Sequence, residues 1–465
     1  MQDYNQTARS CTSFVLTGKA SECGSIVYAK NSDRPFNEAQ PLIFYPAADH
    51  EKGEVVTCSF IKIPQVEHTY ACIGSKPHFF FGFEHGINEF GLMIGNEQVS
   101  GREAPEKQWG LIGMDILRLA LERAKTAREA INVIDDLLKT IGTGGAPTHR
   151  IVPFNANYII SDPDETWLFE SHQRKWVAKK VEDRGWLGNC YSIQEDYDLI
   201  ADGTVEEAVA KGWHHPDLPF NAAKAWTIDQ LLYGESEGFV RYSRMGELLK
   251  AKDKHSIKDC MNILRDHYEG VPELQSIFSK AANKIPGICS HPGGTGSGCA
   301  SAASTVTVIR KDVPDELRFT FWGSMAPPCC SIFRPYYNIG WLPDDLQHAH
   351  ALYRPEDQWW QFIELERYIA LNYDKYAPKV KEVFGRMEDE FIQEAEYIES
   401  NYTGDVNALK EFSQRATERS AQSAAELTAE IKRTLKTKDI DRMLLKYFTE
   451  SAAGCGMPFD GEIIR

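Results

Sequence analysis

The sequence predicts an α+β fold in which β-sheets are covered by helices on their outer faces. Two observations predict it. Patterns typical of strands fill the N-terminal part of the chain, helical periodicity then replaces them, and both patterns return later in alternating blocks. Hydrophobic residues make up 42% of the 465 positions, which is ordinary for a protein with a substantial core. Strands and paired helices in this order are typical of sheets with helices on the outside.

Strands are expected at the beginning of the chain. Residues 12–31 alternate well enough to form two strands, over 13–16 and 26–29, with a turn over 18–24 that has glycine at both ends. Further strands are expected over 57–63, over 69–73 and, after a turn, within the segment 86–97.

Helical periodicity follows these strands. Apolar residues at positions 111, 114, 117, 121 and 124 share one face of a helix. Thr126 and Glu129 form the pattern of a capping box, which predicts the start of a second helix. That helix carries Ile131, Ile134 and Leu138 on one face, and the glycines within 142–145 end it.

The second part of the chain repeats the alternation. Strands are expected over 157–161, 166–170 and 176–181, with a hairpin turn at Asp162-Pro163-Asp164, then helices over about 205–270 and strands over 304–309 and 317–322. From Pro355 onward the chain is charged and helical. We therefore expect a removable leader over 1–10, an α+β core over 11–345, and a helical extension over 355–450 that packs on this core.

The charge of the chain argues against two classes of partner. The formal net charge is −16, and Lys and Arg form no cluster that could neutralise the phosphates of a nucleic acid or an anionic membrane. No apolar stretch approaches the roughly 20 residues of a membrane span. The leader, MQDYNQTARS, has no apolar centre and is therefore not expected to be a secretory signal. The sequence leaves open whether the chain forms a homo-oligomer.

The eleven cysteines are scattered without CxxC pairs, which argues against a disulfide framework and favours a reducing cytoplasm. Cys289, His291 and Cys299 could in principle hold zinc, but they lack the usual paired ligand spacing. The motifs HExxH, GxSxG and the P-loop are absent, and the glycine-rich run at 293–298 lacks the lysine that would reach a phosphate. We expect neither a cofactor nor a metal, and we interpret the glycine-rich run as a flexible loop.

One cysteine stands at the head of the first expected strand. If the chain were cut between Ser10 and Cys11, Cys11 would carry both a thiol and a free α-amine. An α-amine has a pKa of about 7.7–8.0, close to the value that a general base needs at neutral pH, and could take the proton of the thiol. The same residue would then supply nucleophile and base, and the leader would block the amine until it is removed.

Several blocks of the sequence resemble a known family. Cys11-Thr12-Ser13, followed by Lys30-Asn31-Ser32-Asp33-Arg34-Pro35, resembles the start of the secernins and of the related cysteine dipeptidases. The segments GFEHGINEFGLMIGNEQV (82–99), LIGMDILRLALERAKTAREAINVIDDLL (111–138) and LFESHQRKWVAKKV (168–181) are also similar to secernins, in the expected order. The resemblance covers most of residues 11–335, whereas the tail after 355 matches less clearly.

The resemblance implies an N-terminal nucleophile hydrolase, a four-layer α-β-β-α sandwich that frees its own nucleophile and then cleaves amide bonds. On the pattern of the more distant choloylglycine hydrolases, Cys11 matches the nucleophile and Asp33 the carboxylate that holds the freed amine. Asn189 resembles the asparagine that stabilises the oxyanion, and Asn96 a second polar group near it. Arg241 resembles the arginine close to the nucleophile, which could lower the pKa of the thiol or hold a substrate carboxylate.

Each of these residues also has a structural interpretation. Asn96 and Asn189 could be turn residues at strand ends, Asp33 a turn cap, and Arg241 a charge on a helix surface. His85 and His172 could be bases for a cysteine, but the α-amine already fills that role, so we interpret them as structural. Lys30 departs from the choloylglycine hydrolases, which have arginine there, and this departure puts bile-salt specificity in doubt.

The sequence therefore predicts a cytoplasmic, metal-free amidohydrolase of the N-terminal cysteine type, a dipeptidase acting on small peptides. An acylase or acyltransferase acting on a non-peptide amide is the first alternative. A secernin-like regulatory protein with weak or no activity is the second, and retention of the leader would favour it.

Overall fold

The computed structural model describes residues 11–35, 37–105, 109–146, 154–228, 237–271, 287–291, 299–436, 438, 440 and 442–458. The expected leader, residues 1–10, and the glycine-rich run 293–298 lie outside these residues.

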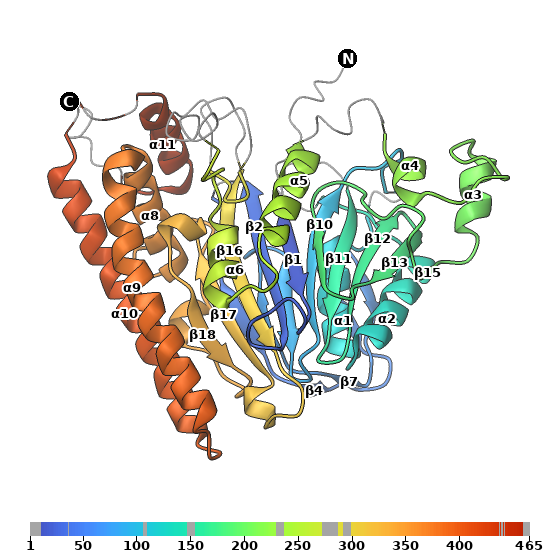
Figure 1. Ribbon diagram of the computed structural model, residues 1–465, viewed down its shortest axis with the longest axis horizontal. Coiled ribbons are helices and arrows are strands. Elements are labelled where there is room, and N and C mark those ends of the chain that lie inside the picture. The colour runs from blue at the N-terminus through green and yellow to red at the C-terminus, as the bar shows by residue number, and fades with distance from the viewer. Residues whose placement is uncertain are drawn as a thin grey trace.

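Most of the described strands belong to two antiparallel sheets, which lie at the centre of the molecule (Figure 1). Sheet 1 has the order β14 (Arg184–Leu187), β1 (Thr12–Leu16), β2 (Ile26–Pro35), β16 (Cys299–Ile309), β17 (Phe319–Met325) and β18 (Arg334–Tyr337). Sheet 2 has the order β15 (Leu199–Ile200), β13 (Lys175–Lys180), β12 (Thr166–His172), β11 (Asn155–Ser161), β10 (Met93–Val99), β9 (His85–Asn88), β8 (Cys72–Ser75) and β3 (Leu42–Tyr45). Two further pairs of short strands are β4 (Ala48–Asp49) with β7 (His68–Thr69), and β5 (Val55–Thr57) with β6 (Lys62–Pro64).

The two sheets face each other, because β1 and β14 of sheet 1 contact β10, β11 and β12 of sheet 2. Successive residues of a strand point to opposite faces of its sheet. Met93 and Ile159 accordingly belong to the core that includes residues of sheet 1, whereas their neighbours Ile94 and Ile160 pack with the helices on the other face. Sheet 2 is therefore apolar on both faces.

Helices cover the outer face of each sheet. Helices α1 (Gly113–Arg123) and α2 (Ala127–Thr140) lie against sheet 2, and α5 (Glu237–Lys250) and α6 (Ile257–Leu264) lie against sheet 1. Two short helices, α3 (Thr204–Ala210) and α4 (Ala222–Trp226), follow β15. The predicted four-layer α-β-β-α sandwich is confirmed.

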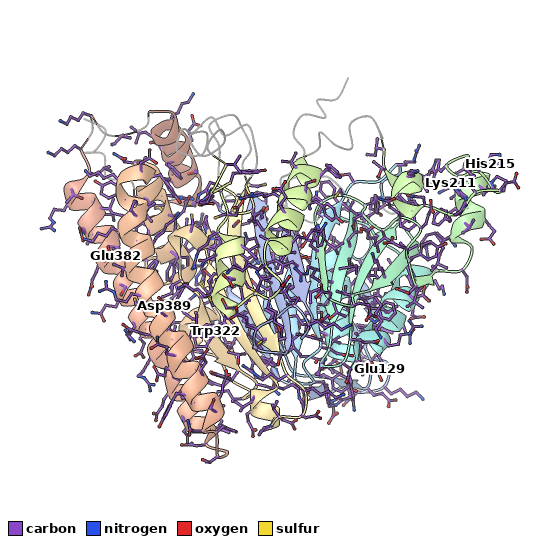
Figure 2. All side chains as sticks on the ribbon, viewed as in Figure 1. Glu129, Lys211, His215, Trp322, Glu382 and Asp389 are labelled. Carbon is purple, nitrogen blue, oxygen red and sulfur yellow. The ribbon has the colours of Figure 1, made fainter. Side chains whose placement is uncertain are left out.

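The C-terminal helices cover the β17–β18 side of sheet 1, at the left of Figure 1. The helices that contact these strands are α8 (Gln358–Ala370), α9 (Tyr373–Ser400) and α10 (Val406–Thr434), and α11 (Arg442–Cys455) follows them in the chain. Figure 2 shows the polar Glu382 and Asp389 on the outside of α9, whereas Trp322 of β17 is buried. The fully buried Glu388 of α9 accepts hydrogen bonds from Arg265 Nη1 at 3.0 Å and from the main-chain N–H of Phe333 at 2.9 Å, which joins these helices to the rest of the chain.

Several expected elements have different bounds in the structure. The strand expected over 57–63 is wrong: β5 and β6 form a hairpin there, closed by a bond from Cys58 N–H to the Ile61 carbonyl at 2.9 Å. The strand expected over 26–29 continues to Pro35, because its polar residues are buried against β16. The strand expected over 317–322 begins only at Phe319, since Leu317 ends a 3₁₀ turn.

The expected start of α2 is confirmed, with one difference. Thr126 Oγ1 accepts a hydrogen bond from the main-chain N–H of Glu129 at 3.2 Å, as a capping box requires. The Glu129 carboxylate, however, accepts from the N–H of Lys125 rather than from that of Thr126, at 2.8 Å. Among the described residues, no helix is long and apolar enough to cross a membrane.

Candidate active site

Cys11 directly precedes β1 and is only 3% exposed. Its Sγ lies 3.7 Å from Glu84 Oε2, toward which the thiol donates. The φ of Cys11 is +24°, a value that residues with a side chain rarely adopt and that costs on the order of 1–3 kcal/mol. The nucleophile predicted from the sequence is therefore buried, strained and next to a carboxylate.

Arg241 of α5 connects two of the other predicted residues, Asp33 and Asn189, to Cys11. It is 1% exposed, and its Nη1 donates to the carbonyl oxygen of Cys11 at 3.3 Å and to Thr12 Oγ1 at 3.0 Å. Nη1 also lies 3.1 Å from Asp33 Oδ2, and Nη2 donates to Asn189 Oδ1 at 2.5 Å. The structure thus brings Cys11, Asp33, Asn189 and Arg241 together, and Arg241 is not a charge on a helix surface.

The register of sheet 1 explains this convergence. Thr12 pairs with Asn31, so Asp33 lies two residues further along β2, at the level of the strand end that carries Cys11. Ser13 pairs with Leu187, so Asn189 lies two residues beyond the end of β14, at the same level on the other side. On the next strand, Ser301 faces Asp33, and Ser301 Oγ donates to Asp33 Oδ1 at 2.6 Å.

A second group of charges lies on the other side of the thiol. Lys30 is fully buried, and its Nζ donates to the main-chain oxygen of Asn96 at 2.5 Å and to Glu97 Oε1 at 3.2 Å. The same Nζ is 4.0 Å from Glu84 Oε2, and Arg34 Nη1 donates to Glu84 Oε1 at 2.7 Å. Two cations therefore surround the carboxylate that faces Cys11.

Asn96 contacts this carboxylate rather than the Arg241 group. In the amide orientation that satisfies its neighbours, Asn96 Nδ2 donates to the main-chain oxygen of Glu84 at 2.9 Å and to Glu84 Oε2 at 2.8 Å. An amide nitrogen has two hydrogens, and Glu84 accepts both. Asn96 thus contacts the carboxylate that faces the thiol, and its amide hydrogens are directed at Glu84.

Burial dominates the electrostatics of the site. It raises the pKa of the Cys11 thiol well above the usual range, Glu84, Glu97 and Asp33 raise it further, and Lys30 lowers it. Burial also raises the pKa of Glu97, to about 7. The pKa of Lys30 is raised, because the anions around it outweigh the effect of its burial. Lys30 is the cation that most favours the thiolate, and Arg34 also interacts electrostatically with Cys11.

Sequence reasoning did not assign roles to Lys30, Glu84, Glu97 or Ser301. Glu84 and Glu97 lie within the block 82–99 that resembles secernins, and Lys30 was noticed only as a departure from a related pattern. Ser301 follows the glycine-rich run, and nothing in its spacing to Cys11 indicates a contact.

The two candidate histidines have structural surroundings. His85 stacks on Phe321 with ring centroids 6.1 Å apart, and burial holds its pKa well below the usual value. His172 Nε2 accepts a hydrogen bond from the N–H of Glu103 at 3.3 Å, and burial lowers its pKa to about 4. In the described part of the chain, no hydrogen bond joins either ring to Cys11.

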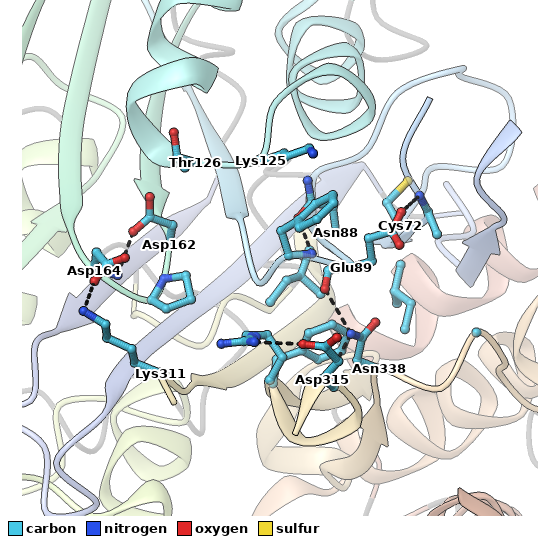
Figure 3. A pocket seen from close by; sticks show the side chains of 18 of the residues that line it. Cys72, Asn88, Glu89, Lys125, Thr126, Asp162, Asp164, Lys311, Asp315 and Asn338 are labelled. Carbon is cyan, nitrogen blue, oxygen red and sulfur yellow. Dashed lines mark hydrogen bonds and ion pairs between the residues drawn. The ribbon is translucent and has the colours of Figure 1, made fainter. Parts of the chain in front are cut away.

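A cavity of about 560 Å³ lies away from this site (Figure 3). Its lining includes Phe319, the first residue of β17, and Lys311, which follows the end of β16. Lys311 Nζ lies 2.5 Å from Asp164 Oδ1, so this lysine is already paired. Since β16 meets Asp33 at its opposite end, the cavity belongs to the other end of the strands from Cys11.

Comparisons with known proteins agree with the predicted family. The model of Peptidase family C69 matches residues 10–208 and 205–385. The probable dipeptidase B of Streptococcus pyogenes serotype M1 is 24% identical over 427 residues, which cover 83% of this chain and 83% of that protein. The probable dipeptidase of Salmonella dublin is 20% identical over 370 residues, covering 70% and 81%. The solved structure of penicillin V acylase from Agrobacterium tumefaciens is similar with a TM-score of 0.35 at 16% identity, over 70% of this chain and 86% of that one.

Proposed function

The chain belongs to peptidase family C69, and from this premise we propose that it is a dipeptidase that hydrolyses small peptides with Cys11 as its nucleophile. The observation that carries the proposal is the convergence of Asp33, Asn189 and Arg241 on Cys11.

Removal of residues 1–10 would prepare the nucleophile. Breaking the bond before Cys11 creates an α-amine next to the thiol, with a pKa of about 7.7–8.0 before any effect of its surroundings. It also removes the peptide bond that defines the φ of +24°, so the strain at Cys11 would be released on cleavage.

Arg241 and Asp33 would hold the new terminus. Arg241 fixes the carbonyl oxygen of Cys11 and the side chain of Thr12, and thereby the backbone on the C-terminal side of the amine. Asp33, fixed by Arg241 and Ser301, supplies an anion close to that backbone, which would favour the protonated amine and orient it.

The reaction would pass through a thioester. The α-amine takes the proton of the thiol, the sulfur attacks the carbonyl carbon of the peptide bond, and the oxyanion forms. The ammonium then returns its proton to the leaving amine as the C–N bond breaks. In the second half the amine takes a proton from water, the hydroxide displaces the sulfur, and the thiol recovers its proton.

Asn189 would stabilise the oxyanion. Its Nδ2 donates one hydrogen to the main-chain oxygen of Gln98 at 2.7 Å, which orients the amide, and an amide nitrogen carries a second hydrogen. Within the described hydrogen bonds that second hydrogen has no acceptor, so it is available to a substrate. Asn96, with both hydrogens on Glu84, would position the carboxylate beside the thiol instead.

Lys30 would favour the thiolate by lowering the pKa of the Cys11 thiol. Burial and the carboxylates around Cys11 favour the protonated thiol, and Lys30 acts in the opposite direction. None of the eleven cysteines, all of them described, forms a disulfide, which agrees with a reducing compartment and supports a cytoplasmic location.

A substrate panel tests the proposal and its alternatives. Processed wild-type protein should hydrolyse unblocked dipeptides, and Cys11→Ala should not. Faster hydrolysis of N-acyl amides than of dipeptides would favour the acylase alternative. Absence of hydrolysis by fully processed protein would favour a regulatory protein and contradict the proposal.

A further inference from the structure

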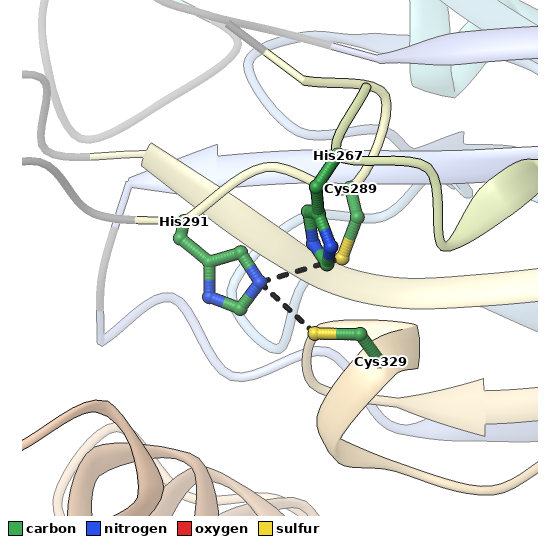
Figure 4. A group of neighbouring side chains, drawn as sticks. All are labelled: His267, Cys289, His291 and Cys329. Carbon is green, nitrogen blue, oxygen red and sulfur yellow. Dashed lines mark hydrogen bonds between the residues drawn. The ribbon is translucent and has the colours of Figure 1, made fainter. Parts of the chain in front are cut away.

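We propose that His267, Cys289, His291 and Cys329 form a binding site for one zinc ion, separate from the catalytic residues (Figure 4). One ligand atom from each residue lies within 4.8 Å of the others. The sequence predicts no metal, and of the three residues that it named as able in principle to hold zinc, Cys289 and His291 belong to this group and Cys299 does not. The inference does not depend on the proposed function.

The distances are close to those of a tetrahedral zinc site. Zinc bonds of about 2.0–2.3 Å to nitrogen and sulfur place neighbouring ligand atoms roughly 3.3–3.8 Å apart. His291 Nε2 lies 3.4 Å from Cys289 Sγ and 3.1 Å from Cys329 Sγ. Small movements of the side chains would therefore complete the tetrahedron around an ion at the centre of the group.

The chemistry of the ligands selects zinc. Two thiolates and two neutral imidazoles balance the charge of a divalent ion, and this donor set is typical of structural zinc sites. Since four protein ligands fill a tetrahedron, no position remains for water or substrate, which separates this site from a catalytic zinc centre.

Carboxylates outside the group orient both histidines. His291 directs Nε2 at the two sulfurs, while its Nδ1 lies 3.5 Å from Glu366 Oε1. His267 Nδ1 lies 3.3 Å from Glu269 Oε1, which would assign its Nε2 to the metal. A carboxylate on the far nitrogen of a ligating histidine is the arrangement that metal sites commonly use to fix the ring.

The group lies inside the protein at a junction. His267, Cys289 and Cys329 are at most 5% exposed. His267 follows α6, Cys289 and His291 precede β16, and Cys329 lies in the 3₁₀ turn Pro328–Cys330. The surrounding helices α8 and α9 contribute Glu366 and Tyr373, whose hydroxyl donates to Cys329 Sγ at 3.4 Å. Zinc would therefore join three segments of the sandwich directly. It would connect them to the C-terminal helices through Glu366 and Tyr373, which contact the ligands.

The site is also connected to the catalytic carboxylate. Ser290 lies between two ligands, and its N–H donates to Ser301 Oγ at 3.1 Å, while the N–H of Ser301 donates to the Ser290 carbonyl at 3.0 Å. Ser301 Oγ in turn donates to Asp33 Oδ1 at 2.6 Å. Bound zinc would thus hold Asp33 in place through Ser301, without contacting the substrate.

The first test is the metal content of the full-length wild-type protein, purified under reducing conditions without added chelator. Elemental analysis should find about one zinc per chain. After removal of the metal, added cobalt should give the visible absorption of a tetrahedral thiolate site. A reduced protein that contains no zinc and binds neither metal would overturn the proposal.

Variants then test the ligand set. Cys289→Ser and Cys329→Ser should each lose zinc, whereas Cys299→Ser and the buried control Cys260→Ser should retain it. Loss of zinc from Cys299→Ser with retention in Cys329→Ser would contradict the proposed ligands. If a variant does not fold, the wild-type stoichiometry still decides. A wild-type chain that contains no zinc, and whose mass rises by two units when reductant is added, would contain a disulfide instead. That result would also overturn the proposal.

Discussion

Replacing Lys30 by methionine should make the Cys11 thiol less acidic. Lys30 Nζ and Cys11 Sγ lie 4.0 and 3.7 Å from the same oxygen, Glu84 Oε2, and therefore within about 8 Å of each other. At that separation and an effective dielectric constant of about 20, a unit charge is worth about 2 kcal/mol, or about 1.5 pKa units. The variant should fold, because Glu97, with a pKa of about 7, can take a proton when its cationic partner is lost. Glu97 raises the thiol pKa less than Lys30 lowers it, so the loss of its charge offsets part of the shift, and about 1.5 units is the upper limit.

The assay is alkylation of Cys11 by iodoacetamide across a pH series, followed by intact mass. Cys11→Ala supplies the background from other cysteines, and the same spectra show whether residues 1–10 are present. Below the thiol pKa the rate follows the thiolate fraction, so Lys30→Met should react more slowly than wild type, by up to about 30-fold. Lys30→Arg, which keeps the charge, should react at close to the wild-type rate. An unchanged pH profile in Lys30→Met, or an equally slow Lys30→Arg, would refute the reasoning.

Three further outcomes are expected. Asn189→Ala, measured on processed protein, should lower kcat and kcat/KM together by about 10²–10³, since it removes an oxyanion donor; a higher KM with intact kcat would make Asn189 a substrate-binding residue. Asp33→Asn should shift the pH–rate profile and slow turnover, and an unchanged rate and profile would leave Asp33 a turn cap. His172, whose pKa falls to about 4 from about 6.5, gives stability that is present above pH 6.5 and lost as the pH falls toward 4, by up to about 3 kcal/mol. His172→Gln should therefore flatten the free energy of unfolding between these pH values, measured by urea denaturation, and leave kcat unchanged; loss of activity on processed protein would contradict its structural assignment.

The layers of the fold could be predicted, because the spacing of apolar residues shows which face of a strand or helix packs in the core. Leu117 and Leu121 recur at helical spacing and pack on sheet 2, as expected. The extent of β2 could not be predicted, because the pattern assigns polar residues to solvent. Lys30 and Asn31 are fully buried in this strand, where side-chain and main-chain partners satisfy them.

Some residues of the candidate site could likewise be predicted from the sequence, and others could not. Cys11 was found from the chemistry of its position, and Asp33, Asn189 and Arg241 from the resemblance to a family. Glu84 reaches the thiol only because sheet 2 packs on sheet 1, and strand periodicity does not encode the alignment of two sheets. The zinc ligands His267 and Cys329 come from distant segments, so no spacing motif could have joined them.

The central claim is that Cys11 acts as an N-terminal residue, and the intact mass of active protein purified from cells tests it most directly. We expect a wild-type chain that begins at Cys11, and a Cys11→Ala chain that keeps residues 1–10 and lacks activity. An active wild-type enzyme whose mass still includes residues 1–10 would contradict it, because the α-amine assigned as the base would then be part of a peptide bond.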